Sequence, residues 1–125
     1  MILGTGLDIV EVARIAELAG KHGERFLKRV FTEAEVKYAM PRAARWQHLA
    51  GRFAAKEAVF KALGTGWGQG VSWKLVEVLP AEAGRPEIRL SGEAAERLAE
   101  LGGRTVHLSI THTEGLAAAS AIIEG

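Results

Sequence analysis

The chain has 125 residues, enough for one ordinary domain spanning 1–125 that buries its own core. Sixteen Lys and Arg against fifteen Asp and Glu give a net charge of +1, which argues against a general nucleic-acid binder. Cysteine is absent, which excludes disulfides and a cysteine nucleophile and fits a cytoplasmic protein. No apolar run is long enough to predict a membrane span or a signal peptide.

Hydrophobic spacing predicts one strand followed mainly by helices, and then mainly strands. In chain order we predict a strand over 2–8, helices over 9–22, about 26–30, between Thr32 and Pro41, and over 42–63, strands over 74–79 and 87–90, a helix over about 92–101, and strands over 105–111 and 116–123. Helices early and strands late favour an α+β fold with an antiparallel sheet.

The long helix over 42–63 carries two charges that need an explanation. Lys56 lies inside its apolar stripe, where an unpaired charge is costly, and Glu57 lies at the edge of that stripe. Glu57 and Lys61 are four residues apart, which suits either a surface salt bridge or a metal carboxylate beside a phosphate-binding ammonium. The side chains on the opposite face are small, so another backbone could approach closely there. They belong to Ala50, Ala54, Ala58 and Ala62.

Asp8 ends a strand face that is otherwise bare. Gly4, Gly6 and Asp8 point the same way in a strand, so a polar ligand could come close to the backbone there. Asp8 and Glu11 also have the spacing of a capping box, so capping of the following helix is the competing interpretation.

The Gly-rich segment 64–70 follows a helix, so it is not a P-loop, which needs a helix N-terminus behind the phosphates. A glycine C-cap and turn is the simple interpretation. Phosphate binding at this helix end would need Lys61 and a divalent cation to offset the helix dipole.

The segment 109–115 is predicted to join two strands, and it places hydroxyl side chains around His112. His112 is either a solvated turn residue or part of a phosphate- or ribose-binding group. Near the N-terminus, Arg14, Lys21, Arg25 and Lys28 would form one basic stripe if the helix continued, either as a solvated face or as a docking surface for an acidic partner.

Three sequence blocks together resemble the signature blocks of the holo-acyl-carrier-protein synthases, the bacterial 4′-phosphopantetheinyl transferases. The blocks are 6–10 (GLDIV), 51–62 (GRFAAKEAVFKA) and 108–113 (LSITHT), and they occur in the family's order. The middle block is the most specific. With the loops between the blocks, the resemblance extends over essentially the whole chain.

The resemblance implies a magnesium-dependent transfer. A serine hydroxyl of apo-acyl carrier protein attacks the β-phosphorus of coenzyme A, the phosphopantetheine arm is transferred, and 3′,5′-ADP leaves. The residues that match the family's metal ligands are Asp8 and Glu57, and carboxylates with phosphate oxygens suit Mg²⁺. Lys61 matches the lysine expected to bind phosphate and stabilise developing charge. The general base stays open between a metal-activated water and His112.

The resemblance also implies the partners and the assembly. Residues expected around coenzyme A are Arg52, Lys61, Gly64, Thr65, Gly66, Ser109, His112 and Thr113, and those expected to meet the acidic carrier protein are Arg14, Arg25, Lys28 and Arg45. The chain holds one repeat where broad-specificity relatives hold two, so the resemblance implies a homotrimer with sites at subunit interfaces. A second copy would bring either the His112 hairpin or the Lys61 loop to Asp8.

Two other functions fit the sequence less well than the transferase. A non-catalytic module that binds carrier protein or nucleotide is disfavoured because Asp8, Glu57 and Lys61 occur together. A small RNA-binding domain is disfavoured by the balanced charge and by the lack of a basic stripe interleaved with aromatic residues.

Overall fold

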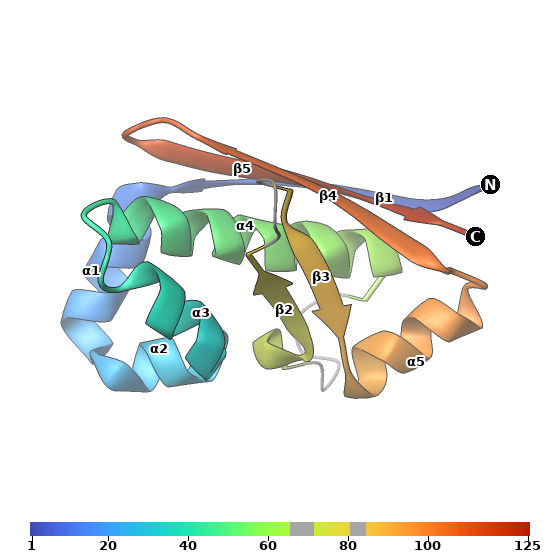
Figure 1. Cartoon of the computed structure of the whole chain (residues 1–125), viewed down its shortest axis with the longest axis horizontal. Coiled ribbons are helices and arrows are strands. Elements are labelled where there is room, and N and C mark those ends of the chain that lie inside the picture. Colours follow the sequence, from blue (N-terminus) through green and yellow to red (C-terminus); the bar gives the residue numbers. More distant parts are fainter. Residues whose placement is uncertain (66–71, 81–84) are drawn as a thin grey trace.

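The computed structural model describes residues 1–65, 72–80 and 85–125. The elements are β1 (Ile2–Glu11), α1 (Val12–His22), α2 (Glu24–Val30), α3 (Glu33–Ala39), α4 (Arg45–Leu63), the 3₁₀ helix η1 (Trp73–Leu75), β2 (Val76–Leu79), β3 (Glu87–Leu90), α5 (Gly92–Glu100), β4 (Thr105–His112) and β5 (Leu116–Glu124). Figure 1 shows α4 lying under a sheet of β1, β5 and β4, with the other helices and the β2–β3 pair on its far side. Within the described residues, no helix combines the length and apolar character needed to cross a membrane.

Both described sheets are antiparallel, as the order of the predicted elements indicated. The larger sheet has the strand order β1-β5-β4, so β5 lies between the two strands that carry Asp8 and His112. Asp8 pairs with Ala119, which pairs with Ile110, and this register sets Asp8 two positions from the end of β4. The smaller sheet is the β2–β3 pair. The fold is therefore α+β, with an antiparallel sheet on a long helix.

The glycines of β1 face the alanines of α4. A Cβ at Gly6 would overlap the carbonyl oxygen of Ala58 and lie 2.9 Å from the backbone nitrogen of Ala62, and a Cβ at Gly4 would overlap the carbonyl oxygen of Ala62. The expectation that a ligand approaches the bare backbone at these glycines is wrong, because α4 already occupies that face. The small residues of both elements instead permit a direct helix–strand contact.

The boundary between β1 and α1 also differs from the prediction. The strand continues to Glu11, because Ile9, Val10 and Glu11 all pair with β5, and the helix starts only at Val12. Glu11 is the N-cap and its side chain makes no capping hydrogen bond, so Asp8 does not cap this helix. Ile9, where the predicted helix begins, is 64% exposed on the outer face of the sheet.

Three other helix boundaries follow their sequence signals, although α4 starts at Arg45 and not at residue 42. Thr32 accepts from the backbone of Glu35, whose carboxylate accepts from the backbone of Thr32, which is the predicted capping box. Gly64 ends α4 with a φ of 73°, in the left-handed region that favours glycine. Gly23, at a φ of 58°, separates α1 from α2, so the basic residues of 14–28 lie on two helices and do not form one continuous helical stripe.

The charge predicted to need a partner, Lys56, has one in Glu35. Both side chains are fully buried, with the ammonium 2.8 Å from the carboxylate. Lys56 also donates to the carbonyls of Val76 at 2.6 Å and Trp73 at 3.3 Å, and Glu35 accepts from the backbone nitrogen of Val78 at 2.8 Å. Burial lowers the pKa of Lys56, and the carboxylate of Glu35 opposes that shift. This network joins α4, α3, η1 and β2 on the side of α4 away from the large sheet.

Substituting Gly6→Ala tests the contact between β1 and α4. The new methyl group meets backbone atoms that cannot rotate away, so we expect a loss of at least about 3 kcal/mol in the free energy of unfolding, measured by urea denaturation. Gly20→Ala is the matched control, because no atom lies within 4 Å of a Cβ there and alanine favours the helix by about 0.5–1 kcal/mol. Equal stability of Gly6→Ala and wild type would contradict this packing.

Substituting Lys56→Met leaves Glu35 buried without its cation. We expect the free energy of unfolding to fall by about 3–5 kcal/mol, because an uncompensated buried carboxylate is strongly destabilising. The double variant Lys56→Met with Glu35→Leu removes both charges and should recover part of the loss, as judged by the same denaturation curves. A single variant as stable as wild type would show that the ion pair does not hold these elements.

Candidate active site

The first candidate group lies where β1 crosses the last turns of α4. The ammonium of Lys61 donates to the Oδ1 of Asp8 at 3.1 Å and to the carbonyl oxygen of Leu7 at 2.9 Å. The side chain of Asp8 is 10% exposed and that of Lys61 is 55% exposed. Two residues 53 positions apart in the chain thus meet at one edge of the sheet, with the ammonium open to a ligand.

Glu57 belongs to the same edge of α4. It lies one helical turn before Lys61, and residues four apart share a helix face. Glu57 is half-buried, so its carboxylate is not fully enclosed. Over the described ranges, no group of three or more His, Asp and Glu side chains forms a metal cage. Two carboxylates suit Mg²⁺, which usually completes its shell with phosphate oxygens and water.

The predicted coenzyme residues at the end of α4 lie close to this group. Gly64 caps the helix, and the backbone of Thr65 donates to the carbonyl of Phe60 at 3.1 Å. The hydroxyl oxygen of Thr65 is buried and has no hydrogen-bond partner. Gly66 lies outside the described residues.

A second group, which we call the cationic cluster, consists of Tyr38, Arg42, His48, Arg52 and His112. The ring of His48 lies 5.7 Å from that of Tyr38 and 6.2 Å from that of His112, edge to face in both cases. The guanidinium carbons of Arg42 and Arg52 lie 3.6 Å and 4.4 Å from the centroid of the Tyr38 ring. The cluster brings together two predicted coenzyme residues, Arg52 and His112, from α4 and β4.

The electrostatics of the cluster favour an anion. Arg52 is 7% exposed, its Nε has no hydrogen-bond partner, and its Nη1 makes only a 3.4 Å bond to the carbonyl of His48. Burial lowers the pKa of Arg52, although Glu35 and Tyr38 oppose the shift. The pKa of His48 is also lowered, most by burial and then by the charges of Arg52 and Arg42 and by His112. A phosphate oxygen would supply the acceptor that the guanidinium lacks.

The two groups lie at opposite edges of the large sheet within one chain. Asp8 is on β1 and His112 on β4, with β5 between them, which is a separation of roughly 10 Å across the strands alone. Ser109 is in register with Ser120 and Leu7 on the outer face, away from α4. Thr113 accepts from the backbone of Leu116 at 3.1 Å within the hairpin turn. One chain therefore brings Asp8 into contact with Lys61, with Glu57 one helical turn before Lys61, and separately links Arg52 to His112 through Tyr38 and His48. Ser109 and Thr113 join neither group.

The sequence analysis missed three members of the cationic cluster, Tyr38, Arg42 and His48. Arg42 and His48 precede the specific middle block, and Tyr38 lies on α3, so no motif marked them. The available signal was the density of cationic residues before the block, where Arg42, Arg45 and His48 occur within seven positions. Their meeting with His112, more than 60 positions away, depends on tertiary packing.

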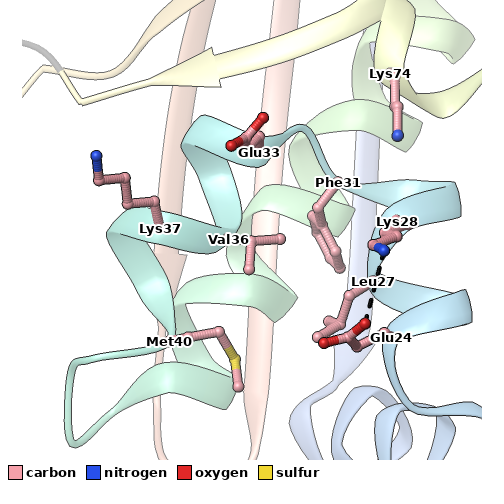
Figure 2. A pocket seen from close by; sticks show the side chains of 9 residues that line it. All are labelled: Glu24, Leu27, Lys28, Phe31, Glu33, Val36, Lys37, Met40 and Lys74. Atoms are coloured by element: carbon pink, nitrogen blue, oxygen red, sulfur yellow. Dashed lines mark ion pairs between the residues drawn. The ribbon is translucent and has the colours of Figure 1, made fainter.

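The residues predicted to meet a carrier protein lie on the helical side of the molecule. Arg14 on α1 and Arg25 and Lys28 on α2 are exposed, and Arg45, at the start of α4, donates to the carbonyl of Arg42 at 3.4 Å. Lys28 also borders a groove of 910 Å³ between α2, α3 and η1. Figure 2 shows its apolar floor and charged rim. Among the predicted site residues that the structure describes, only Lys28 lines this groove, so the groove lies apart from Asp8 and Arg52.

Known proteins share both the sequence and the fold of this chain. Residues 4–119 match the family model of the 4′-phosphopantetheinyl transferase superfamily. The chain is 51% identical over 124 residues to the holo-[acyl-carrier-protein] synthase of Koribacter versatilis, and the match covers 99% of each protein.

Two crystal structures extend the comparison to the fold. The holo-[acyl-carrier-protein] synthase of Neisseria meningitidis has a TM-score of 0.89 and 36% identity, with 100% of both chains covered. The Helicobacter pylori synthase, in complex with coenzyme A, has a TM-score of 0.83 and 29% identity, covering 96% of this chain and 99% of that one. The chain therefore belongs to the 4′-phosphopantetheinyl transferase superfamily, and its full-length similarity is to the holo-[acyl-carrier-protein] synthases.

Proposed function

We propose that Asp8, Glu57 and Lys61 carry the chemistry of this chain. The chain transfers the 4′-phosphopantetheine arm of coenzyme A to a serine of apo-acyl carrier protein. The serine oxygen forms a bond to the β-phosphorus while its hydroxyl proton passes to a general base, either water or His112. The bond from that phosphorus to the bridging oxygen breaks, and 3′,5′-ADP leaves. The observation that carries the assignment is the 3.1 Å contact between Lys61 and Asp8, because it joins the first and middle sequence blocks at one point.

Asp8 and Glu57 are the residues that would hold Mg²⁺. Their oxygen donors suit this hard cation, and with only two carboxylates the remaining positions fall to the diphosphate and water. When bound, the ion neutralises diphosphate charge and makes the phosphorus more electrophilic.

Lys61 supplies the fixed positive charge at the diphosphate. Its ammonium is held by Asp8 and the carbonyl of Leu7 but is more than half exposed, so it can also donate to a phosphate oxygen. A preorganised ammonium stabilises the charge that develops on the leaving diphosphate oxygen. Gly64 and Thr65, at the end of the same helix, border the coenzyme on this side.

The working site combines two chains of a homotrimer. One protomer presents Asp8, Glu57 and Lys61 at its β1 edge, and its neighbour presents Arg52 and His112 at its β4 edge. Because Lys61 already contacts Asp8 within one chain, the segment that a second copy brings is the His112 hairpin. A head-to-tail contact between unlike edges closes into a ring under rotational symmetry.

The outer face of the large sheet supports this assembly. Leu7 and Ile9 of β1 are 69% and 64% exposed there, and Leu116 and Ile122 of β5 are 43% and 37% exposed. Exposed apolar side chains on one flat face are typical of a surface that another chain covers. Three such sheets facing a common axis would meet edge to edge, β4 against β1, at each corner.

The carrier protein docks on the basic helical surface. Arg14, Arg25 and Lys28 are exposed on α1 and α2, and Arg45 lies at the start of α4. Their charge would attract an acidic carrier protein over a distance set by the ionic strength. Both substrates and the absence of cysteine fit a cytoplasmic enzyme.

The function is tested by mass spectrometry of apo-acyl carrier protein after incubation with coenzyme A, Mg²⁺ and this protein. We expect the carrier to gain the mass of one phosphopantetheine and 3′,5′-ADP to accumulate in equal amount. No gain, in a reaction where a known synthase modifies the same carrier, would refute the function.

In the same assay, Glu57→Gln should lower activity by at least about 100-fold at limiting Mg²⁺, because the amide is a far weaker ligand for the ion. The apparent affinity for Mg²⁺ should fall in a metal titration. The matched control is Glu96→Gln on α5, an exposed glutamate outside both groups, which should behave as wild type. Near-normal activity of Glu57→Gln with an unchanged Mg²⁺ titration would remove Glu57 from the metal site.

The assembly is tested by light scattering on a size-exclusion column. Wild type should have the mass of three chains, and Leu7→Lys should dissociate it, since three lysines would be buried around one axis without partners. Transferase activity should fall together with the trimer. Ala99→Lys, on the exposed side of α5, should keep both. A fully active wild-type monomer would rule out a site shared between chains.

A further inference from the structure

His48 is a member of the cationic cluster to which neither the sequence motifs nor the proposed function gives a role. It lies on α4 one turn before Arg52, whose guanidinium donates to the His48 carbonyl. Its ring makes edge-to-face contacts with Tyr38 on α3 and with His112 at the end of β4. The imidazole therefore sits between two predicted coenzyme residues, Arg52 and His112.

Besides the ring of Tyr38, the groups around His48 are two arginines and a second histidine. The segment after α3 contributes Arg42, which stacks over Tyr38 and donates to its backbone carbonyl. The helix α4 contributes Arg52, and β4 contributes His112. Glu35 acts on Arg52, but its carboxylate is already bound by Lys56. A cluster with this charge, and with a buried guanidinium whose Nε has no hydrogen-bond partner, is built to receive an anion.

Coenzyme A carries two separate anionic groups, and this argument rests on the proposed function. The diphosphate must lie at Asp8 and Lys61, because the bond that breaks belongs to it. The phosphate monoester on the ribose, which stays on the 3′,5′-ADP product, needs a second cationic site. The cationic cluster of the neighbouring protomer is the remaining candidate, and a monoester dianion carries enough charge to match it.

We propose that His48 is a further coenzyme-binding residue, and that its imidazole takes up a proton when the phosphate monoester enters the cationic cluster. In the free protein, burial and the neighbouring cations keep the pKa of His48 low, so the ring is neutral at neutral pH. A phosphate dianion nearby favours the charged ring and reverses that effect. Coenzyme binding is therefore tighter at lower pH within the range where the monoester is already a dianion.

Isothermal titration calorimetry with Mg²⁺ tests this, using coenzyme A and dephospho-coenzyme A as probes in buffers of different ionisation enthalpy. At pH 7.5 we expect net proton uptake with coenzyme A and little with dephospho-coenzyme A, which keeps the diphosphate but lacks the monoester. His48→Phe preserves an aromatic ring against Tyr38 but cannot be protonated. It should weaken coenzyme A binding roughly tenfold at pH 7 and abolish part of the proton uptake.

The pH dependence separates a binding role from a structural one. The affinities of wild type and His48→Phe for coenzyme A should converge at pH 9, where the wild-type ring is neutral in both states, and their affinities for dephospho-coenzyme A should agree at every pH. His22→Gln, an exposed histidine at the end of α1, is the matched control and should behave as wild type. Equal weakening for both ligands, a pH-independent loss, or no proton uptake by wild type would overturn the proposal. If neither ligand binds wild type, the proposed function itself fails.

Discussion

The contact between the backbone of β1 and the backbone of α4 is the constraint on which the candidate site depends. Gly4 and Gly6 have no side chain where the carbonyls of Ala62 and Ala58 pass, so the strand lies directly on the helix. Asp8 is the next residue on that face, and Lys61 reaches it at 3.1 Å. Any larger residue at Gly6 would lift the strand and separate the carboxylate from the ammonium. The alanines of the middle block therefore matter to the chemistry as much as its charged residues.

The opposite side of α4 is fixed by a buried ion pair. Lys56 binds Glu35 and two carbonyls of the segment 73–76. These bonds hold α3, η1 and β2 against one turn of α4. Such a pair is no more stabilising than a well-packed apolar pair, but it accepts only one arrangement of its partners. Since Glu57 is the next residue, the pair that fixes the rotation of α4 also fixes the direction of the candidate metal ligand.

The two functional groups of one chain face away from each other. A helix presents different faces at Arg52 and Glu57, and the sheet carries Asp8 and His112 on strands separated by β5. A single chain thus holds the contact between Asp8 and Lys61 at one edge of the sheet and the cationic cluster at the other edge. Under the proposed function this arrangement gives a physical reason for assembly, because each group would meet the other only in a neighbouring copy. The exposed leucine and isoleucine side chains on the sheet face supply the apolar surface for it.

The sequence by itself determined the elements whose signals are local. The capping box at Thr32, the glycine that ends α4 and the strand over 87–90 all appear where expected, because each depends on residues within a few positions. The three blocks also predicted Asp8, Glu57 and Lys61 as one set, of which the structure brings Asp8 and Lys61 into contact. Tertiary structure decided the rest. Strand β1 extends through Ile9 because β5 offers hydrogen bonds there, which overrides the helical spacing. Lys56 contacts Glu35, and His48 contacts His112, only because elements distant in the chain pack together. No local sequence pattern around these residues predicts the contacts.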